Sequence, residues 1–117
     1  MREITIHKSH DQDRQPKLTA MGHIGTGGSE QLYRIEFKCP DGSEMHLPLD
    51  FISLEHDGVT NEALLAVVID RLEGFQAGPF NCTENAVAQD HARAALNMLH
   101  ARTMARIARG VENQATA

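Results

Sequence analysis

Apolar and polar residues alternate with two different periods along this chain. The shorter period occurs in the segment 31–38, where every second residue is apolar: Tyr33, Ile35 and Phe37. A period of two is typical of a strand with one buried face. The alternation resumes in the segment 45–49, after a Cys-Pro-Asp-Gly sequence in which proline and glycine favour a turn. We therefore expect a β-hairpin, with its second strand at a sheet edge because Pro48 has no N–H to donate.

The residues before this hairpin carry weaker patterns. Glu3–His7 alternates, with Ile4 and Ile6 on one face, and predicts a short strand. Lys8–Pro16 is polar without periodicity and is expected to be a loop. The glycine-rich segment Gly22–Gly28 lacks the Gly-Lys-Ser/Thr ending of a phosphate-binding loop, and no convincing strand precedes it. We therefore interpret this segment as a hairpin connection.

The second half of the chain follows the longer period of a helix. Thr60 or Asn61 can cap a first helix, and five apolar residues then recur at helical spacing. These residues are Leu65, Val68, Ile69, Leu72 and Phe75. Further apolar residues lie off this stripe, so the helix requires partners on more than one side. It must end near Gln76, because Gly78 and Pro79 follow.

A second helix is expected to begin at Asn81, because Asn81 and Glu84 have the spacing of a capping box. No glycine or proline follows before Gly110, so this helix should continue to about Arg109. At ~1.5 Å per residue it would be roughly 40 Å long, which is more than one small core needs. Several alanines along it would allow the close approach of another helix. The excess length therefore predicts a subunit interface.

These elements predict an α+β fold. A small N-terminal antiparallel β layer is followed by a C-terminal antiparallel helical hairpin whose second helix is long. With 117 residues and 41% hydrophobic content, the chain can bury the core of a single domain. We divide that domain into a β-rich part (1–56), the helical hairpin (57–112) and a tail (113–117).

Charge and composition restrict the classes of function. A net charge of −5 argues against a general DNA- or RNA-binding protein. Because neither a signal-peptide core nor a long apolar run is present, we expect a soluble intracellular protein without membrane contact. The two cysteines fit no zinc spacing, and no two of the seven histidines have the i, i+4 spacing of a helical zinc site. We therefore expect no metal and no cofactor.

Basic charge is concentrated near the end of the second helix. Arg102, Arg106 and Arg109 stand at i, i+4 and i+7, so they share one helical face. No acidic residue occurs between Asp90 and Glu112. One interpretation is a solvated face that complements the helix dipole, and the other is an anion-binding site. These residues alone favour the first interpretation.

Three motifs occur together in the C-terminal half: Asp57–Leu65, Ile69–Asn85, and Arg102-Thr103 with Arg106 and Ala108–Glu112. Together they resemble the helical-hairpin domain of phage signal-sponge proteins, the anti-Thoeris and anti-CBASS family. The resemblance implies a protein that counters bacterial immunity by sequestering a nucleotide second messenger. The β-rich first half makes the chain more similar to the anti-Thoeris members, which bind glycocyclic ADP-ribose, than to the all-helical anti-CBASS members.

The resemblance also implies an assembly and a set of ligand contacts. It implies a homodimer in the host bacterial cytoplasm, able to assemble further into a hexamer as a trimer of dimers, with messenger pockets between subunits. It implies binding without catalysis, so no enzyme activity is expected. The implied ligand-binding positions are Phe75, Asn85, Arg102 and Arg106, with Arg109 as a further candidate. An aromatic face can stack on a purine, an amide can bind ring nitrogens or ribose hydroxyls, and guanidinium groups suit pyrophosphate.

Alternatives stay open on the residues alone. Phe75 can instead complete the apolar core, and Asn85 can make a local hydrogen bond in the first helical turn. The protein could bind the cyclic di- or trinucleotides of CBASS, at a separate site. A messenger-degrading enzyme would need a nucleophile or base near the arginines, where only His100 is available, on a different helical face. A plain helical scaffold would bind no ligand.

Overall fold

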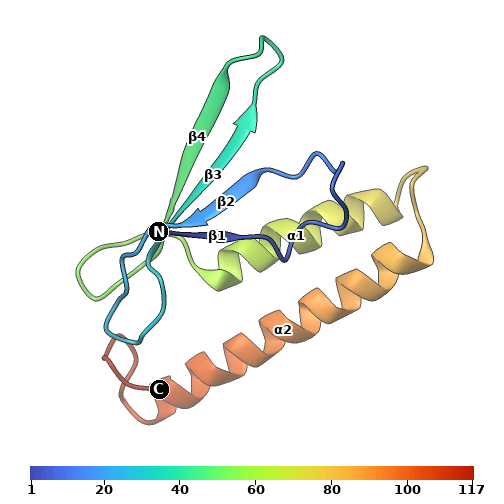
Figure 1. Ribbon diagram of the computed structural model, residues 1–117. Coiled ribbons are helices and arrows are strands. Elements are labelled where there is room, and N and C mark those ends of the chain that lie inside the picture. Colours follow the sequence, from blue (N-terminus) through green and yellow to red (C-terminus); the bar gives the residue numbers. More distant parts are fainter. The chain divides into compact units, whose positions relative to one another are not determined.

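The computed structural model describes residues 1–117 and confirms the predicted α+β class (Figure 1). Four strands precede two helices: β1 (Arg2–Ile4), β2 (Lys17–Ala20), β3 (Leu32–Lys38), β4 (Glu44–Asp50), α1 (Asn61–Gln76) and α2 (Thr83–Ala108). Internal contacts divide the chain into two compact units, Met1–Val59 with the sheet and Thr60–Ala117 with the helical hairpin. That the two units form one domain stays a prediction.

The four strands form one antiparallel sheet in the order β1-β2-β3-β4. The predicted hairpin is β3 and β4, and its apolar residues pair directly across the strands: Tyr33 with Leu49, Ile35 with Leu47 and Phe37 with Met45. Its turn contains Gly42, which has a φ of 87° and donates its N–H to the carbonyl of Cys39 at 2.9 Å. β4 lies at the sheet edge, as Pro48 predicted.

Two expectations for the N-terminal segment are wrong. The first strand ends at Ile4 and not at His7, because the chain turns at Thr5, whose carbonyl accepts the N–H of Lys8 at 3.0 Å. Ile6 consequently lies outside the strand and is exposed. A strand does precede the glycine-rich segment, namely β2. Its four residues, Lys-Leu-Thr-Ala, are too short an alternation to be distinguished from a loop.

The glycine-rich segment connects β2 to β3, which confirms the hairpin interpretation. The carboxylate of Glu30 organises it by accepting the N–H groups of Gly22 at 2.7 Å, His23 at 2.6 Å and Leu32 at 3.3 Å. Burial acts to raise the pKa of Glu30, but these donors outweigh burial and the pKa is lowered. The backbone donors of this segment therefore bind a carboxylate from their own hairpin.

Side-chain caps mark the start of each helix, and a short connector separates the end of α1 from the start of α2. α1 begins after Thr60, whose Oγ1 accepts the N–H of Ala63 at 3.0 Å, and it ends at Gln76 as predicted. The N-cap of α2 is Cys82, whose Sγ accepts the N–H of Asn85 at 3.4 Å.

The prediction that Asn81 caps α2 is wrong. The Asn81 side-chain amide instead donates to the carbonyl of Gly78 at 3.0 Å, which holds Asn81 inside the connector. Because that side chain is already bonded, the helix starts one position later than a cap at Asn81 would allow.

The end of α2 has the geometry that Gly110 predicted. This glycine adopts a φ of 72° and donates its N–H to the carbonyl of Ile107 at 3.0 Å. The next N–H, that of Val111, reaches the carbonyl of Arg106 at 3.0 Å. These two bonds form a Schellman motif, which ends the helix and turns the chain back.

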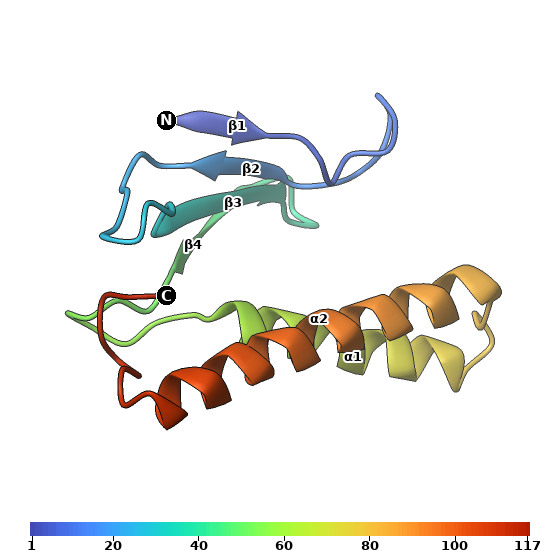
Figure 2. The same cartoon turned by 90° about the horizontal axis from the view of Figure 1, so that it is seen from below.

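The two helices of the hairpin run antiparallel and pack against each other (Figure 2). Ile69 is buried, and an ion pair joins Glu73 of α1 to Arg93 of α2. Several apolar side chains of both helices nevertheless stay exposed: Val67, Val68, Val87, Met98, Met104 and Ile107. A single chain therefore leaves part of the apolar helix surface without a partner. Neither helix combines the length and the apolar character needed to cross a lipid bilayer.

Candidate functional site

The end of the hairpin near the connector carries a cluster that we call the aromatic end: the exposed Arg71, Phe75 and Phe80 and the half-buried Asn85. The guanidinium carbon of Arg71 lies 5.5 Å from the centroid of the Phe75 ring, within the range of a cation–π contact. The Phe80 ring lies 6.4 Å from the Phe75 ring, centroid to centroid, with an angle of 50° between their planes. Phe75 is 37% exposed and Phe80 is 70% exposed, so both rings are accessible to a ligand.

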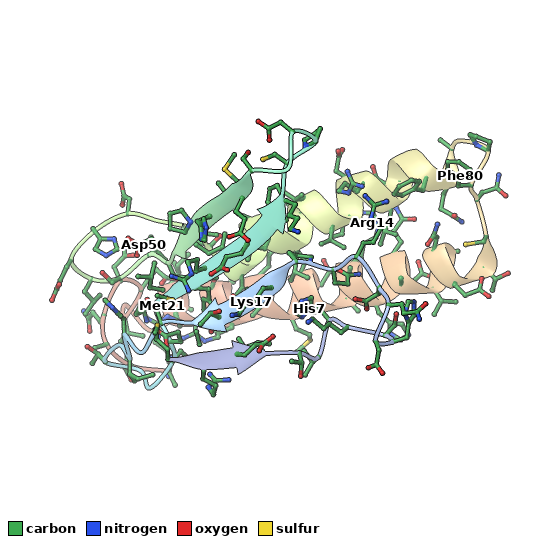
Figure 3. The ribbon with its side chains drawn as sticks, turned by 45° about the horizontal axis from the view of Figure 1, so that its top comes forward. His7, Arg14, Lys17, Met21, Asp50 and Phe80 are labelled. Atoms are coloured by element: carbon green, nitrogen blue, oxygen red, sulfur yellow. The ribbon has the colours of Figure 1, made fainter.

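Side-chain hydrogen bonds hold the connector beside this cluster. The Asn85 amide donates to the carbonyl of Phe80 at 3.4 Å, and the side-chain oxygen of Gln76 accepts the N–H of Cys82 at 3.0 Å. Figure 3 shows Phe80 at the connector, where α1 passes into α2. Asn85 thus makes a local hydrogen bond, while its side-chain oxygen keeps its acceptor capacity.

The opposite end of the hairpin carries the basic cluster, which we call the arginine end: Arg102, Arg106 and Arg109. α2 has 26 residues and α1 has 16, so at ~1.5 Å per residue α2 is longer by roughly 15 Å. Because the helices are antiparallel and share a short connector, the last turns of α2 project past the beginning of α1 (Figure 2). Arg102 lies on this projection and is exposed.

Arg106 has a different environment from Arg102. It is only 4% exposed, and its guanidinium donates to oxygen atoms of the residues that follow α2. Nε donates to the Glu112 carboxylate at 3.4 Å, and Nη2 donates to the carbonyls of Val111 and Gln114, both at 2.9 Å. Nη1 donates to the carbonyl of Thr116.

Arg109 is exposed at the end of α2, where it serves as the C-cap residue. Its guanidinium donates to the carbonyl of Ala117. The arginine end therefore presents one accessible guanidinium, that of Arg102, and two that contact residues 111–117.

The four principal candidate positions do not meet within one chain. Phe75 and Asn85 lie together at the aromatic end, and Arg102 and Arg106 lie one turn apart on α2. Asn85 and Arg102 are seventeen residues apart on the same helix, which corresponds to roughly 25 Å along its axis at ~1.5 Å per residue. One hairpin thus carries the two groups of candidate residues at opposite ends.

A shallow apolar groove lies between these two ends. It has a volume of about 380 Å³ and is lined by Asn61, Leu64, Leu65, Val68 and Leu99. No charged side chain lines it, so it offers nothing to bind a pyrophosphate. Its apolar lining suits contact with another protein surface instead.

One histidine, His100, lies near the arginine end in the sequence. His100 is exposed and precedes Arg102 by two residues, which turns it to another side of the helix. No three His, Cys, Asp or Glu side chains gather in a way that could hold a metal ion. Both cysteines, Cys39 and Cys82, are free thiols.

Arg71 and Phe80 were not among the residues predicted from the sequence. Arg71 stands four residues before Phe75 on α1, and this spacing brings side chains together on a helix, so it could have identified the contact. Phe80 has no comparable pattern, because its approach to Phe75 depends on how the connector folds.

Comparisons with known proteins agree with the hairpin geometry. Residues 46–104 match the family model described as "Acb2/Tad1, hairpin domain". A protein of Bacillus phage SBSphiJ7, "Thoeris anti-defense 1", is 39% identical over 99 residues, which cover 83% of this chain and 69% of that protein. The resemblance inferred from the hairpin motifs is confirmed, and the chain belongs to the Acb2/Tad1 hairpin-domain family.

Proposed function

We propose that this chain is a phage or prophage anti-defence protein that binds glycocyclic ADP-ribose and holds it intact, so that the Thoeris effector is not activated. The family membership supports this proposal, and so does the relative whose name is "Thoeris anti-defense 1". The protein acts in the host bacterial cytoplasm, where a messenger of the immune system would be intercepted. The proposal needs a site that recognises both a purine nucleoside and a pyrophosphate.

The two ends of the hairpin supply these two kinds of recognition. At the aromatic end, Phe75 offers a ring face to a base, and the Asn85 amide can bind ring nitrogens or ribose hydroxyls. Phe80 and Arg71 extend this surface, since both lie against the Phe75 ring. At the arginine end, the guanidinium groups one turn apart on α2 suit the two phosphates of a pyrophosphate.

The observation that carries the proposal is the separation of these half-sites by roughly 25 Å along α2. One small ligand cannot span it within a single hairpin. Two copies related by a two-fold axis can place the arginine end of each beside the aromatic end of the other. A homodimer therefore contains two equivalent composite sites.

Surface chemistry supports this arrangement of two copies. The apolar groove and the exposed Val67, Val68 and Met98 provide apolar area for an interface between hairpins. Charge also favours an antiparallel pairing of hairpins, because the first half of α2 contains Glu84 and Asp90 while its last turns contain arginines.

The proposed site binds and does not cleave. Its contacts are aromatic, amide and guanidinium groups, none of which acts as a general base at neutral pH. His100, the nearest candidate base in the sequence, lies on another side of α2 from Arg102.

A messenger panel tests the proposal. The protein is incubated with glycocyclic ADP-ribose, other cyclic ADP-ribose isomers, and cyclic di- and trinucleotides, and the excess is then removed. Heating releases the bound nucleotide, which mass spectrometry identifies. We expect intact glycocyclic ADP-ribose. Release of cyclic di- or trinucleotides alone would assign the protein to CBASS messengers, and release of no nucleotide would reject the proposal.

A further inference from the structure

Arg106 is buried by a segment of its own chain, which we call the strap: Val111–Ala117. The Schellman motif at Gly110 turns the chain back, and the strap then continues through a residue with a φ of 65°, Asn113. Within it, Gln114 donates its N–H to the carbonyl of Val111 at 3.1 Å. In Figure 1 the strap lies beside the last turns of α2.

Hydrogen bonds to Arg106 are the main contacts of the strap. Four guanidinium bonds reach it: to the Glu112 carboxylate and to the carbonyls of Val111, Gln114 and Thr116. Asn113 and every residue after it are exposed, so the strap has almost no apolar anchor. Segments with few buried apolar contacts open at low free-energy cost.

The strap presents to Arg106 the same kind of group that a nucleotide would present. Carbonyl and carboxylate oxygens accept guanidinium N–H bonds just as phosphate oxygens do, but the pyrophosphate of the messenger carries two negative charges in total, whereas the strap offers only that of Glu112. While the strap covers Arg106, the Glu112 carboxylate supplies the negative charge beside the guanidinium. Arg102, one turn earlier, is exposed and accessible to an incoming anion.

We propose that the strap is an autoinhibitory device that occupies Arg106 in the ligand-free protein and is displaced when the pyrophosphate of the messenger binds. This inference rests on the proposed function, because it takes Arg106 as a messenger contact. Arg102 makes the first contact with the incoming anion, and Arg106 joins once the strap has opened. The strap thus lowers the apparent affinity for every anion that needs Arg106.

Only molecules with an open strap bind the messenger fully. The apparent association constant is therefore the intrinsic constant multiplied by the fraction of open molecules. If closed molecules outnumber open ones by about ten to one, its removal tightens binding roughly tenfold. A variant that ends at an amidated Val111 tests this directly, and the amide ensures that no new carboxylate faces Arg106. It keeps the Schellman bond from Val111 to Arg106 and removes three of the four groups that the Arg106 guanidinium contacts.

Two substitutions accompany the truncation. Glu112→Gln removes the charge of the strap while keeping an oxygen for Arg106, so it should tighten binding by a smaller factor. Thr116→Ala is the matched control, because Thr116 contacts Arg106 through its backbone carbonyl and its side chain makes no hydrogen bond to the strap or to α2. It should bind the messenger like the wild type.

The measurement is calorimetric titration of glycocyclic ADP-ribose, with hydrogen exchange of residues 111–117 followed in parallel. We expect tighter binding by the truncated protein, and faster exchange of the strap when the wild type is saturated. Unchanged or weaker binding by the truncated protein would overturn the inference, since the strap would then be neutral or part of the ligand site. Slower exchange on saturation would overturn it as well.

Inorganic pyrophosphate separates this inference from the proposed function. If the wild type binds no messenger, the proposed function fails, but the strap can still be tested with pyrophosphate. The Nε–H resonance of Arg106 reports its occupancy by NMR. Pyrophosphate should shift this resonance at a lower concentration in the truncated protein than in the wild type. If the same pyrophosphate concentration shifted the Arg106 resonance in both proteins, the inference would be overturned, whatever the result with the messenger.

Discussion

Asn85 and Arg102 lie on one continuous helix, roughly 25 Å apart along its axis, although both are proposed contacts of one small nucleotide. In the proposed function, each hairpin therefore contributes an aromatic half-site at one end and a basic half-site at the other. If the proposed contacts are right, this separation restricts the assembly, because the proposed site then needs residues from two copies.

Combining two weakened variants in one dimer tests this requirement. Phe75→Ala alters the aromatic half-site, and Arg102→Glu alters the basic half-site. In a mixed dimer, isolated through two different affinity tags, one composite site carries both changes and the other carries neither. Messenger binding should therefore return to about one tight site per mixed dimer, as counted by calorimetry.

The control for this mixing experiment is a dimer with both changes in one chain and neither in the other. Each of its composite sites then contains one altered half, so no tight site should form. If the mixed dimer of the two single variants also lacks a tight site, the proposal of a composite site is wrong.

Removal of the Phe75 ring should weaken messenger binding without unfolding the hairpin. The ring is 37% exposed, and loss of a base-stacking surface costs on the order of 1–3 kcal/mol. Titration calorimetry gives the affinity of Phe75→Ala, and circular dichroism gives its helix content. Phe37→Ala is a matched control in the sheet unit, because Phe37 is similarly exposed at 42%. Unfolding of Phe75→Ala would instead identify this ring as a structural residue.

Reversal of the charge at Arg102 should abolish sequestration while leaving the fold unchanged. This side chain is exposed, and a carboxylate in its place would repel the bound pyrophosphate. Arg109→Glu should have a smaller effect, because Arg109 is exposed at the helix end and solvent screens it. Equal messenger affinity of the wild type and Arg102→Glu would remove Arg102 from the site. Arg106→Glu is less informative, since it also disrupts the strap.

The stability of the sheet unit should depend on pH through Glu30. The lowered pKa of Glu30 means that its ionised form stabilises the fold at pH values above the ordinary Glu pKa of about 4.3. This contribution is lost as the pH falls through the lowered pKa, where the carboxylate becomes protonated. Glu30→Gln should therefore be less stable than the wild type at pH 7, and the difference should shrink in acid. Thermal unfolding at several pH values measures it, and a difference independent of pH would contradict the role of the carboxylate.

Sequence patterns predicted those parts of the fold that local physical chemistry determines. The alternation of Tyr33, Ile35 and Phe37 identified β3, and the threonine at position 60 marked the start of α1. The sequence patterns did not predict β2, because its four residues form a strand only through pairing with both neighbouring strands. The start of α2 was misplaced for a similar reason, because the Asn81 side chain is engaged within the connector.

The candidate site could be predicted only in part. The i, i+4 spacing of Arg102 and Arg106 placed them on one helical face, but it could not distinguish their environments. Arg106 is buried because the chain turns back after Gly110, and that path depends on several weak contacts beyond the helix. The contact of Phe80 with Phe75 likewise follows from the folded connector.

The central claim is that the messenger is captured intact, and phosphorus NMR tests it most directly. One equivalent of glycocyclic ADP-ribose is added to the protein, and its phosphorus resonances are followed for several hours and again after heat release. We predict that the resonances shift on binding, stay constant with time, and return unchanged when the protein is denatured. New resonances that grow with time, or the absence of any shift on mixing, would contradict the claim.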